Sequence, residues 1–180
     1  MPVSLPSGLF ILTGDIHMLE DIVKQIRAVL QNQLPGKLDQ IELERADGVT
    51  LDDIQYFYLQ GGHKDGRHNY PNITILGDAA TCTNASLPPS PRRELRHKIS
   101  IWLTDRVVAP DRELSLCRLL RYVEAVERIL AGDPSLGGKV INSTIISHRY
   151  FHNKGKEVED FVRVALLVLE VMERPSTSAY

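Results

Sequence analysis

The sequence has 180 residues, 43% of them hydrophobic and 24% charged, with a formal net charge of −2. This composition excludes neither enzymes nor structural proteins, but it argues against a disordered chain and a membrane protein. A protein with a near-neutral net charge also lacks the overall positive charge expected of a dedicated DNA-binding protein. We therefore expect one globular domain over residues 1–180.

The first predicted element is an amphipathic helix over residues 15–34. Its apolar residues recur at steps of three and four, which places them on one helix face. They are Ile16, Leu19, Ile22, Val23, Ile26, Val29 and Leu30. Thr13 or Asp15 can cap the first turn. Pro35 followed by Gly36 predicts the end of the helix, because proline cannot continue the hydrogen-bond ladder.

The next part of the chain has the alternating or β-prone patterns of short strands. These strands are expected over residues 39–44, 54–59, 70–76 and 97–107. Polar segments rich in glycine or proline predict mobile loops over residues 61–69 and 81–96. The second loop would join two neighbouring antiparallel strands as a long hairpin.

A second amphipathic helix is expected to begin after Asp111 and to end at Gly132, with Pro134 just beyond. Two strands follow, over residues 140–151 and 161–172, and residues 173–180 are expected to be a frayed tail. The order of elements predicts an α+β fold. It comprises one mostly antiparallel sheet of four or five strands, with two amphipathic helices packed on one face, plus long loops.

The predicted strand over residues 161–172 is apolar on both alternating faces between Val164 and Leu169. Two helices can cover only one face of such a sheet, so the other face needs a separate cover. Either residues 38–59 fold over it, or another subunit does, because monomers seldom expose a large contiguous apolar surface.

Histidines and cysteines do not form a recognisable catalytic or metal site in the sequence. His63 and His68 lie in one predicted loop, and His148 and His152 share one face of a predicted strand, but a third ligand is missing. The two cysteines, Cys82 and Cys117, are too few for a disulfide framework, so we expect reduced thiols. We expect no metal and no cofactor.

Acidic pairs and one arginine cluster offer a weaker enzymatic reading. Asp52 with Asp53, and Glu157 with Glu159 and Asp160, could hold a divalent ion, but solvated polar faces explain them more simply. A second cluster consists of Arg92, Arg93 and Arg96, which either face a partner or DNA or lie in a solvated loop. The residues favour a protein that is not an enzyme.

The segment over residues 112–172 resembles the C-terminal part of the tail terminator, or tail completion, proteins of long-tailed bacteriophages. The resemblance is carried by a helix that ends in residues 131–138 (AGDPSLGG), then a strand, a turn and the strand over residues 162–171 (VRVALLVLEV). The preceding helix and the segments 71–75 (PNITI) and 98–103 (KISIWL) are consistent with the same family. The region 38–70 is larger than the family minimum.

This resemblance implies a hexameric ring at the neck of the virion, assembled in the host cytoplasm. Such a ring caps the tail tube, stops its polymerisation and joins it to the head. The implied partners are further copies of the chain, the tail tube protein, a head–tail connector or stopper protein, and genomic DNA that passes through the lumen without sequence-specific binding. No membrane and no catalytic residue is implied.

The turn after the second predicted helix is the candidate subunit contact. It includes Asp133, Pro134, Leu136, Gly137 and Gly138, which would otherwise be an ordinary helix stop. Two alternatives to a tail terminator stay open. One is another neck component, such as a head completion or stopper protein, and the other is a metal-dependent enzyme of nucleic-acid metabolism.

Overall fold

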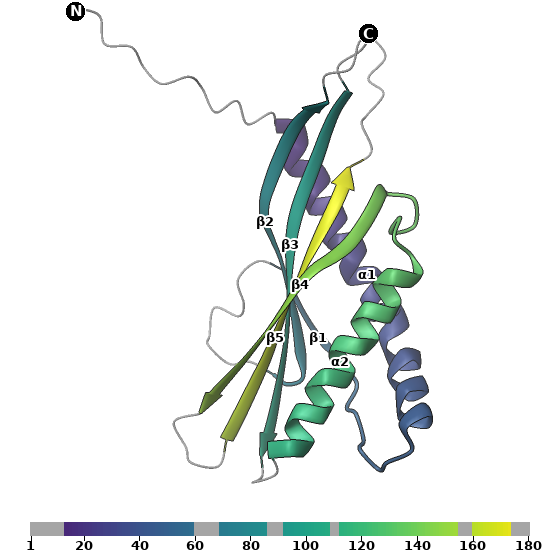
Figure 1. The fold of residues 1–180 in the computed structure, drawn as a ribbon, viewed down its shortest axis with the longest axis vertical. Coiled ribbons are helices and arrows are strands. Elements are labelled where there is room, and N and C mark those ends of the chain that lie inside the picture. The colour runs from purple at the N-terminus through teal and green to yellow at the C-terminus, as the bar shows by residue number, and fades with distance from the viewer. Residues whose placement is uncertain (1–12, 60–68, 86–91, 109–111, 155–159, 174–180) are drawn as a thin grey trace, which may run out of the picture.

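Two helices and five strands make up the described part of the chain (Figure 1). A computed structural model describes residues 13–59, 69–85, 92–108, 112–154 and 160–173. The elements, in chain order, are α1 Thr13–Arg45, β1 Tyr56–Leu59, β2 Asn72–Ala85, β3 Arg92–Val108, α2 Arg112–Gly132, β4 Val140–Lys154 and β5 Asp160–Glu173. None of the helices within these ranges has the length and apolar character needed to cross a bilayer.

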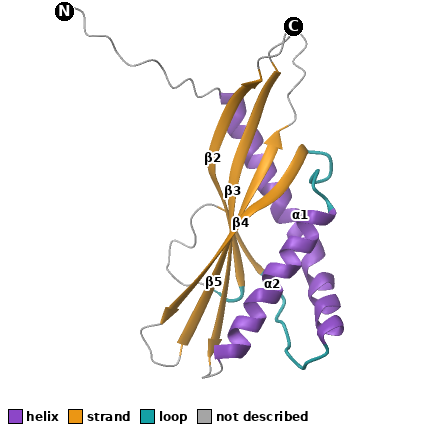
Figure 2. Ribbon diagram, in the orientation of Figure 1, coloured by secondary structure: helices purple, strands orange, loops and turns teal. Residues whose placement is uncertain are grey.

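The strands form one sheet in the order β1-β2-β3-β5-β4. The short strand β1 runs parallel to β2, whereas the pairs β2 with β3, β3 with β5, and β4 with β5 are antiparallel. Both helices lie on the same side of the sheet (Figure 2). The predicted α+β class is confirmed, with a mostly antiparallel sheet and two helices on one face.

The hydrophobic core lies between the helices and the sheet face toward them. Alternate residues of the central strands point into it and are almost fully buried: Ile73, Ile75, Ile99, Ile101, Leu103, Ala165, Leu167, Leu169 and Val171. The helices contribute their apolar stripes, including Ile26 and Leu30 of α1 and Val126 and Leu130 of α2. The period-two and period-3.6 patterns in the sequence therefore meet in one core.

Helix α1 continues through Pro35, so the predicted helix end at residues 35–36 and the predicted strand over residues 39–44 are wrong. Leu34, Leu38 and Ile41 extend the apolar stripe beyond the proline, and each is at most 2% exposed. Burial of this longer stripe outweighs the roughly 3 kcal/mol that a proline costs inside a helix. On the exposed side of the helix, the Lys37 ammonium donates a hydrogen bond to the Gln40 side chain at 2.8 Å, a contact between residues three apart that is typical of a helix.

The region 38–59 does not cover the second face of the sheet, so that expectation is wrong. Its apolar residues Leu38, Ile41 and Ile54 belong to the core on the helix side, and Leu51 packs against that core. The segment between α1 and β1 runs beside α2. The distal end of the region then adds β1 to one edge of the sheet.

The predicted loop over residues 81–96 is wrong at both ends, because β2 extends to Ala85 and β3 begins at Arg92. Thirteen residue pairs join β2 to β3, from Asn72 opposite Thr104 to Ala85 opposite Arg92. The two strands therefore form a long antiparallel ribbon, as expected for neighbouring strands of a hairpin. Residues 86–91 lie outside the described residues, as does the predicted loop over 61–69 except for Asn69.

The expected frayed tail is wrong for its first residue. Glu173 ends β5 and accepts a hydrogen bond across a distance of 2.8 Å from His97 Nε2, and His97 is completely buried. Residues 174–180 lie outside the described residues. The pair joins β3 to β5 on the helix side of the sheet, so polar contacts hold the last described residue in place.

Replacing Pro35 tests the continuity of α1. Pro35→Ala should raise the free energy of unfolding by about 1–3 kcal/mol, because alanine restores a backbone donor toward the carbonyl of Gln31 and removes a steric clash. Gly36→Ala is the matched control: its new Cβ meets no atom within 4 Å, and it should add about 0.5–1 kcal/mol. Urea denaturation measures both. Destabilisation by both substitutions would indicate a helix break at residues 35–36.

Candidate assembly surface

The turn between α2 and β4 is held by a dense set of short-range hydrogen bonds. The Asp133 carboxylate accepts from the Gly137 backbone N–H at 2.7 Å and from the Ser135 hydroxyl at 2.9 Å. The Ser135 hydroxyl in turn accepts from the Gly138 N–H at 3.1 Å. Leu136, Gly137 and Gly138 all have positive φ, a conformation that glycine adopts readily and leucine rarely does.

The side chains of this turn differ in their burial. Leu136 is completely buried and belongs to the core cluster, so its side chain anchors the turn despite a φ of 49°. A Cβ on Gly137 would lie 3.1 Å from the Gln25 side chain of α1, which places α1 beside the turn. Pro134 is exposed. It is therefore the exposed apolar side chain of the turn.

An open groove of about 390 Å³ lies next to this turn, between α2 and the edge strand β4. Its walls are mostly apolar on the α2 side and mostly polar on the β4 side. The lining residues are Glu127, Leu130, Ala131, Pro134, Asn142, Ser143, Thr144, Ile145 and Leu169. The hydroxyl of Ser143 is buried there and has no hydrogen-bond partner within the described part of the chain.

Strand β4 forms one edge of the sheet and, among the described residues, pairs only with β5. It exposes four large apolar side chains, each more than two-fifths accessible: Ile141, Ile146, Tyr150 and Phe151. The pairing with β5 is irregular between Val140 and Asn142 and again between Ile145 and Ser147. Long edges with apolar side chains invite pairing with another chain, and bulges restrict where such pairing can occur.

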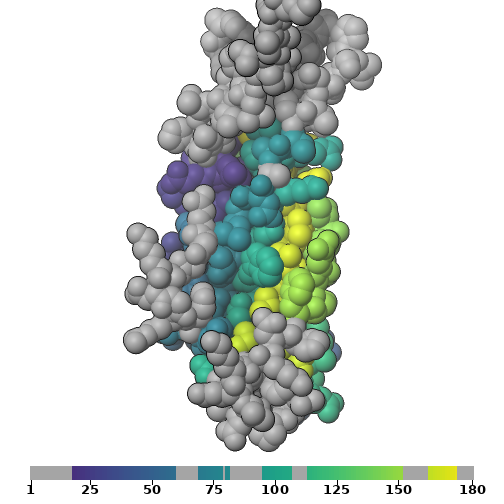
Figure 3. All heavy atoms as spheres, turned by 90° about the vertical axis from the view of Figure 1, so that its left-hand side faces the viewer, coloured from purple at the N-terminus to yellow at the C-terminus, as the bar shows by residue number. Residues whose placement is uncertain are grey.

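The face of the sheet opposite the helices is also apolar at its centre. Trp102, Val164, Leu166 and Val168 point to this side, and Trp102 stacks on Phe151 with ring centroids 6.0 Å apart. Neither helix covers this face in Figure 3, where side chains of β3, β5 and β4 lie side by side. Neither helix therefore supplies the cover that we expected for the second face of β5.

The candidate arginines lie on a strand and not in a loop, because Arg92, Arg93 and Arg96 all belong to β3. Arg96 forms an ion pair with Glu170 of β5 at 3.1 Å, and its side chain is 39% exposed. One member of the predicted cluster is thus engaged within the sheet. The side-chain positions of the other two lie outside what the structure describes.

The residues considered for chemistry are dispersed in the structure. His148 pairs with Glu127 at 2.8 Å, whereas His63 and His68 lie outside the described residues. Cys117 lies on α2 as a free thiol. Glu157 and Glu159 are likewise undescribed, and Asp52 is committed to an ion pair with Arg118 at 2.5 Å. The described residues contain no group of three side chains suited to a metal ion.

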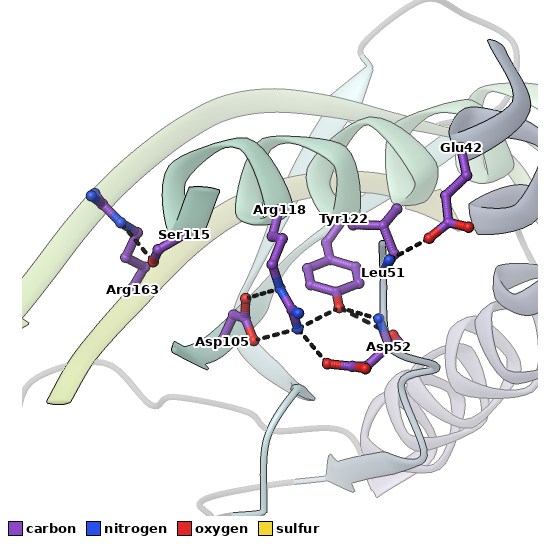
Figure 4. A network of polar contacts seen from close by, with 8 residues as sticks. All are labelled: Glu42, Leu51, Asp52, Asp105, Ser115, Arg118, Tyr122 and Arg163. Atoms are coloured by element: carbon purple, nitrogen blue, oxygen red, sulfur yellow. Dashed lines mark hydrogen bonds and ion pairs between the residues drawn. The ribbon is translucent and has the colours of Figure 1, made fainter. Parts of the chain in front are cut away.

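A buried polar network that the sequence patterns did not indicate surrounds Arg118 of α2 (Figure 4). Its guanidinium donates to Asp105 of β3 at 3.1 Å and to Asp52 at 2.5 Å. Asp105 is 1% exposed. Burial raises the pKa of the Asp105 carboxyl despite the adjacent guanidinium. The pKa of Arg118 is raised because the two carboxylates favour its charged form, so the arginine stays ionised.

Tyr122, one helical turn from Arg118, completes the network. Its hydroxyl donates to the Asp52 carbonyl at 3.1 Å and accepts from the Asp52 N–H at 3.0 Å. Burial raises the pKa of this phenol, which therefore stays protonated as a donor. Arg121 donates to the Val49 carbonyl at 3.2 Å and pairs with Asp47. Three side chains of α2 thus fix the connection between α1 and β1.

The only sequence signal for this network was indirect. Arg118 and Tyr122 lie four residues apart on α2, a spacing that brings side chains together on one helix face. Nothing in the sequence linked them to Asp52 and Asp105, because those residues come from distant segments. The network uses its charges within the fold, so we read it as structural.

Removing the guanidinium tests that reading. Arg118→Met should lower the free energy of unfolding by about 3–5 kcal/mol, because it leaves a buried carboxylate without a partner. Adding Asp105→Asn should recover most of the loss. Arg128→Met is the control, since its partners Glu44 and Glu124 are at the surface, and it should cost at most about 1 kcal/mol. Equal losses for the two single variants, measured by urea denaturation, would contradict the buried pair.

Substitutions in the turn should separate its two kinds of residue. Asp133→Ala removes the acceptor of two hydrogen bonds and should lower the free energy of unfolding by about 1–3 kcal/mol. Pro134→Ala, at an exposed position, should change it by no more than about 0.5 kcal/mol. Thermal unfolding compares them. A larger loss for Pro134→Ala would show that Pro134 supports the fold.

Comparisons with known proteins add little to this description. No protein-family model matches the sequence, and no curated protein matches it. One similar solved chain comes from the virion of a native gene transfer agent particle. The two chains share 11% sequence identity with a TM-score of 0.35, and the match covers 83% of this chain and 98% of the other. Similarity at this level carries no argument about function.

Proposed function

We propose that this chain is a structural virion protein of a tailed bacteriophage, forming a ring at the head-proximal end of the tail. There it terminates growth of the tail tube and joins the tail to the head connector. One observation carries the proposal. The segment that resembles tail terminator proteins, residues 112–172, contains α2, the Asp133–Gly138 turn, the edge strand β4 and the two-sided strand β5.

The surface of this segment supports an assembly role. It has an exposed strand edge, a groove whose α2 wall is mostly apolar, and a sheet face that neither helix covers. A subunit of a closed ring needs two different surfaces that fit each other, one on each side. The β4 edge with its groove provides one such surface. The other edge of the sheet is formed by the short strand β1.

The proposed partners follow from the position of the ring. Neighbouring copies contact the surface around the Asp133–Gly138 turn, with Pro134 as its exposed apolar residue. The tail tube protein lies on one side of the ring and the connector or stopper protein on the other. Genomic DNA passes through the lumen without sequence-specific contacts, and Arg92 and Arg93 are the candidate cationic side chains toward it.

Micrographs of particles assembled without this protein test the proposal. Loss of a terminator should give overlong or disordered tails, because nothing stops tube polymerisation. Normal free tails together with leaking heads would instead assign the chain to the connector side of the neck. Complementing these particles with the Pro134→Ala or the Asp133→Ala variant controls for protein folding, because only Asp133→Ala is expected to destabilise the fold.

The competing enzymatic reading has its own test. Purified protein is incubated with plasmid DNA and Mg²⁺ or Mn²⁺, and nicking is followed on gels. We expect no cleavage, because Asp52 is bound to Arg118. Cleavage that disappears in Asp53→Asn would overturn the structural assignment in favour of a metal-dependent nuclease.

A further inference from the structure

We propose that α2 and the edge strand β4 together bind an amphipathic helix of another protein, and that this helix carries a lysine or an arginine. The binding surface, the α2–β4 seam, consists of Leu116, Leu120 and Glu127 of α2 with His148 and Tyr150 of β4. It is separate from the strand edge, groove and turn that join copies of the chain in the proposed function, so it does not rest on that function.

One side of the seam is a stripe along α2. Steps of four and seven residues separate Leu116, Leu120 and Glu127, and both steps return to the same side of a helix with 3.6 residues per turn. Glu127 contacts His148 at 2.8 Å, so this stripe faces β4. Val123, in the same stripe, is 3% exposed, whereas Leu116 is 39% and Leu120 is 42% exposed. The described part of the chain therefore leaves the N-terminal half of an apolar stripe partly uncovered.

The other side of the seam is the face of β4 that points toward the helices. Tyr150 pairs with Ala165, and directly opposed residues of an antiparallel pair point to the same face. Ala165 is buried in the core beneath the helices, so Tyr150 also points to the helix side, yet 48% of it is exposed. Burial and the nearby carboxylate of Glu127 raise the pKa of the Tyr150 phenol, which agrees with a position beside α2.

The dimensions of the two layers leave room for a third helix at this position. The five strands, about 4.8 Å apart, occupy roughly 24 Å, whereas two helices about 10 Å in diameter cover roughly 20 Å. Packed helices lie about 8–10 Å apart, so a helix beside α2 would lie over β4 and cover Leu116, Leu120 and Tyr150 together. A strand added to the edge of β4 would leave the two leucines uncovered. The seam therefore fits a helix better than a strand.

Charge determines which helix fits. Within the described ranges, Glu127 pairs with the imidazole of His148 and with no lysine or arginine. On the α1 side of the same helix, by contrast, Glu124 pairs with Arg45 at 3.0 Å. A lysine or arginine of the partner would complement the Glu127 carboxylate. Leu120 and Glu127 are seven residues apart, about 10 Å along α2, so the basic residue lies about two turns from the apolar residues of the partner helix.

A second copy of the chain does not offer this pattern in its described helices. Helix α1 exposes one large apolar side chain among its described residues, Leu43, and the residue one turn earlier is the acidic Asp39. Two antiparallel copies of α2 that met at Leu120 would bring Glu127 opposite Glu113, and opposed like charges disfavour such a contact. We therefore assign the seam to a different protein.

Selection from a displayed library tests the proposal on the full-length protein. The probe is a yeast-displayed set of helices of about 20 residues, long enough to span the seam. Each helix has leucine at two positions four apart, and all amino acids are allowed at its other exposed positions. Helices that bind the wild type should be enriched in lysine or arginine about two turns from the leucine pair. Helices that bind Glu127→Lys should be enriched in aspartate or glutamate there, because the charge that they meet is reversed.

Asp39→Lys is the matched control, because it makes the same charge change at an exposed position of α1. It should leave the preference for basic residues unchanged. Glu127→Lys removes a partly exposed pair with His148, so its thermal unfolding midpoint should fall by no more than about 4 °C.

A selected helix then serves as a labelled peptide for affinity measurements by fluorescence anisotropy. Leu120→Asp should weaken its binding by about tenfold or more, since an apolar contact is lost and a carboxylate is desolvated. Leu43→Asp, at the exposed apolar position of α1, should leave the affinity unchanged. Replacing the basic residue of the peptide by glutamine should weaken binding to the wild type by about two- to fivefold. The same replacement should have no effect on binding to Glu127→Gln.

The proposal is overturned if no helix is selected, if the helices selected on the wild type show no preference for a basic residue, or if Glu127→Lys leaves that preference unchanged. Analytical ultracentrifugation distinguishes the remaining occupant. Loss of a wild-type oligomer in Leu120→Asp would assign the seam to a second copy of the chain, and it would also overturn the proposal.

Discussion

A sheet with helices on a single side is the constraint on which the rest of this structure depends. The helices α1 and α2 bury the face formed by alternate residues of β2, β3 and β5, and that burial supplies the core. Because both helices pack on that face, neither helix covers the opposite face or the β4 edge. The open strand edge and the sheet face without a helix are direct consequences of this arrangement.

Polar contacts position the helices on that sheet. Asp105, near the C-terminal end of β3, binds Arg118 of α2, which in turn binds Asp52 in the connection that follows α1 (Figure 4). One guanidinium therefore links the sheet, the second helix and an irregular segment. Buried ion pairs contribute less to net stability than to the choice of one arrangement, and they penalise alternatives that leave a charge unpaired. This role accounts for the charged residues in the interior.

Much of the architecture was predictable because it follows from local periodicity. The alternation of Ile99, Ile101 and Leu103 and the helical stripe of α2 gave the correct element types and the correct inward faces. Errors arose where a local rule met a longer-range gain. Pro35 predicts a helix end, although Leu38 and Ile41 continue the apolar stripe beyond it. The polar and proline-rich composition of residues 81–96 predicts a loop, although the ends of β2 and β3 pair with each other's backbone.

By itself the sequence determined the fold class, the two inward-facing helices and the doubly apolar character of β5, because these depend on side-chain spacing along the chain. Tertiary structure alone decided which strand became the edge, where the groove lies, and which residues meet around Arg118. Those features depend on contacts between segments far apart in the chain, such as Asp52 with Arg118 and Gln25 with Gly137. Spacing within one segment carries no information about which distant segment will lie against it.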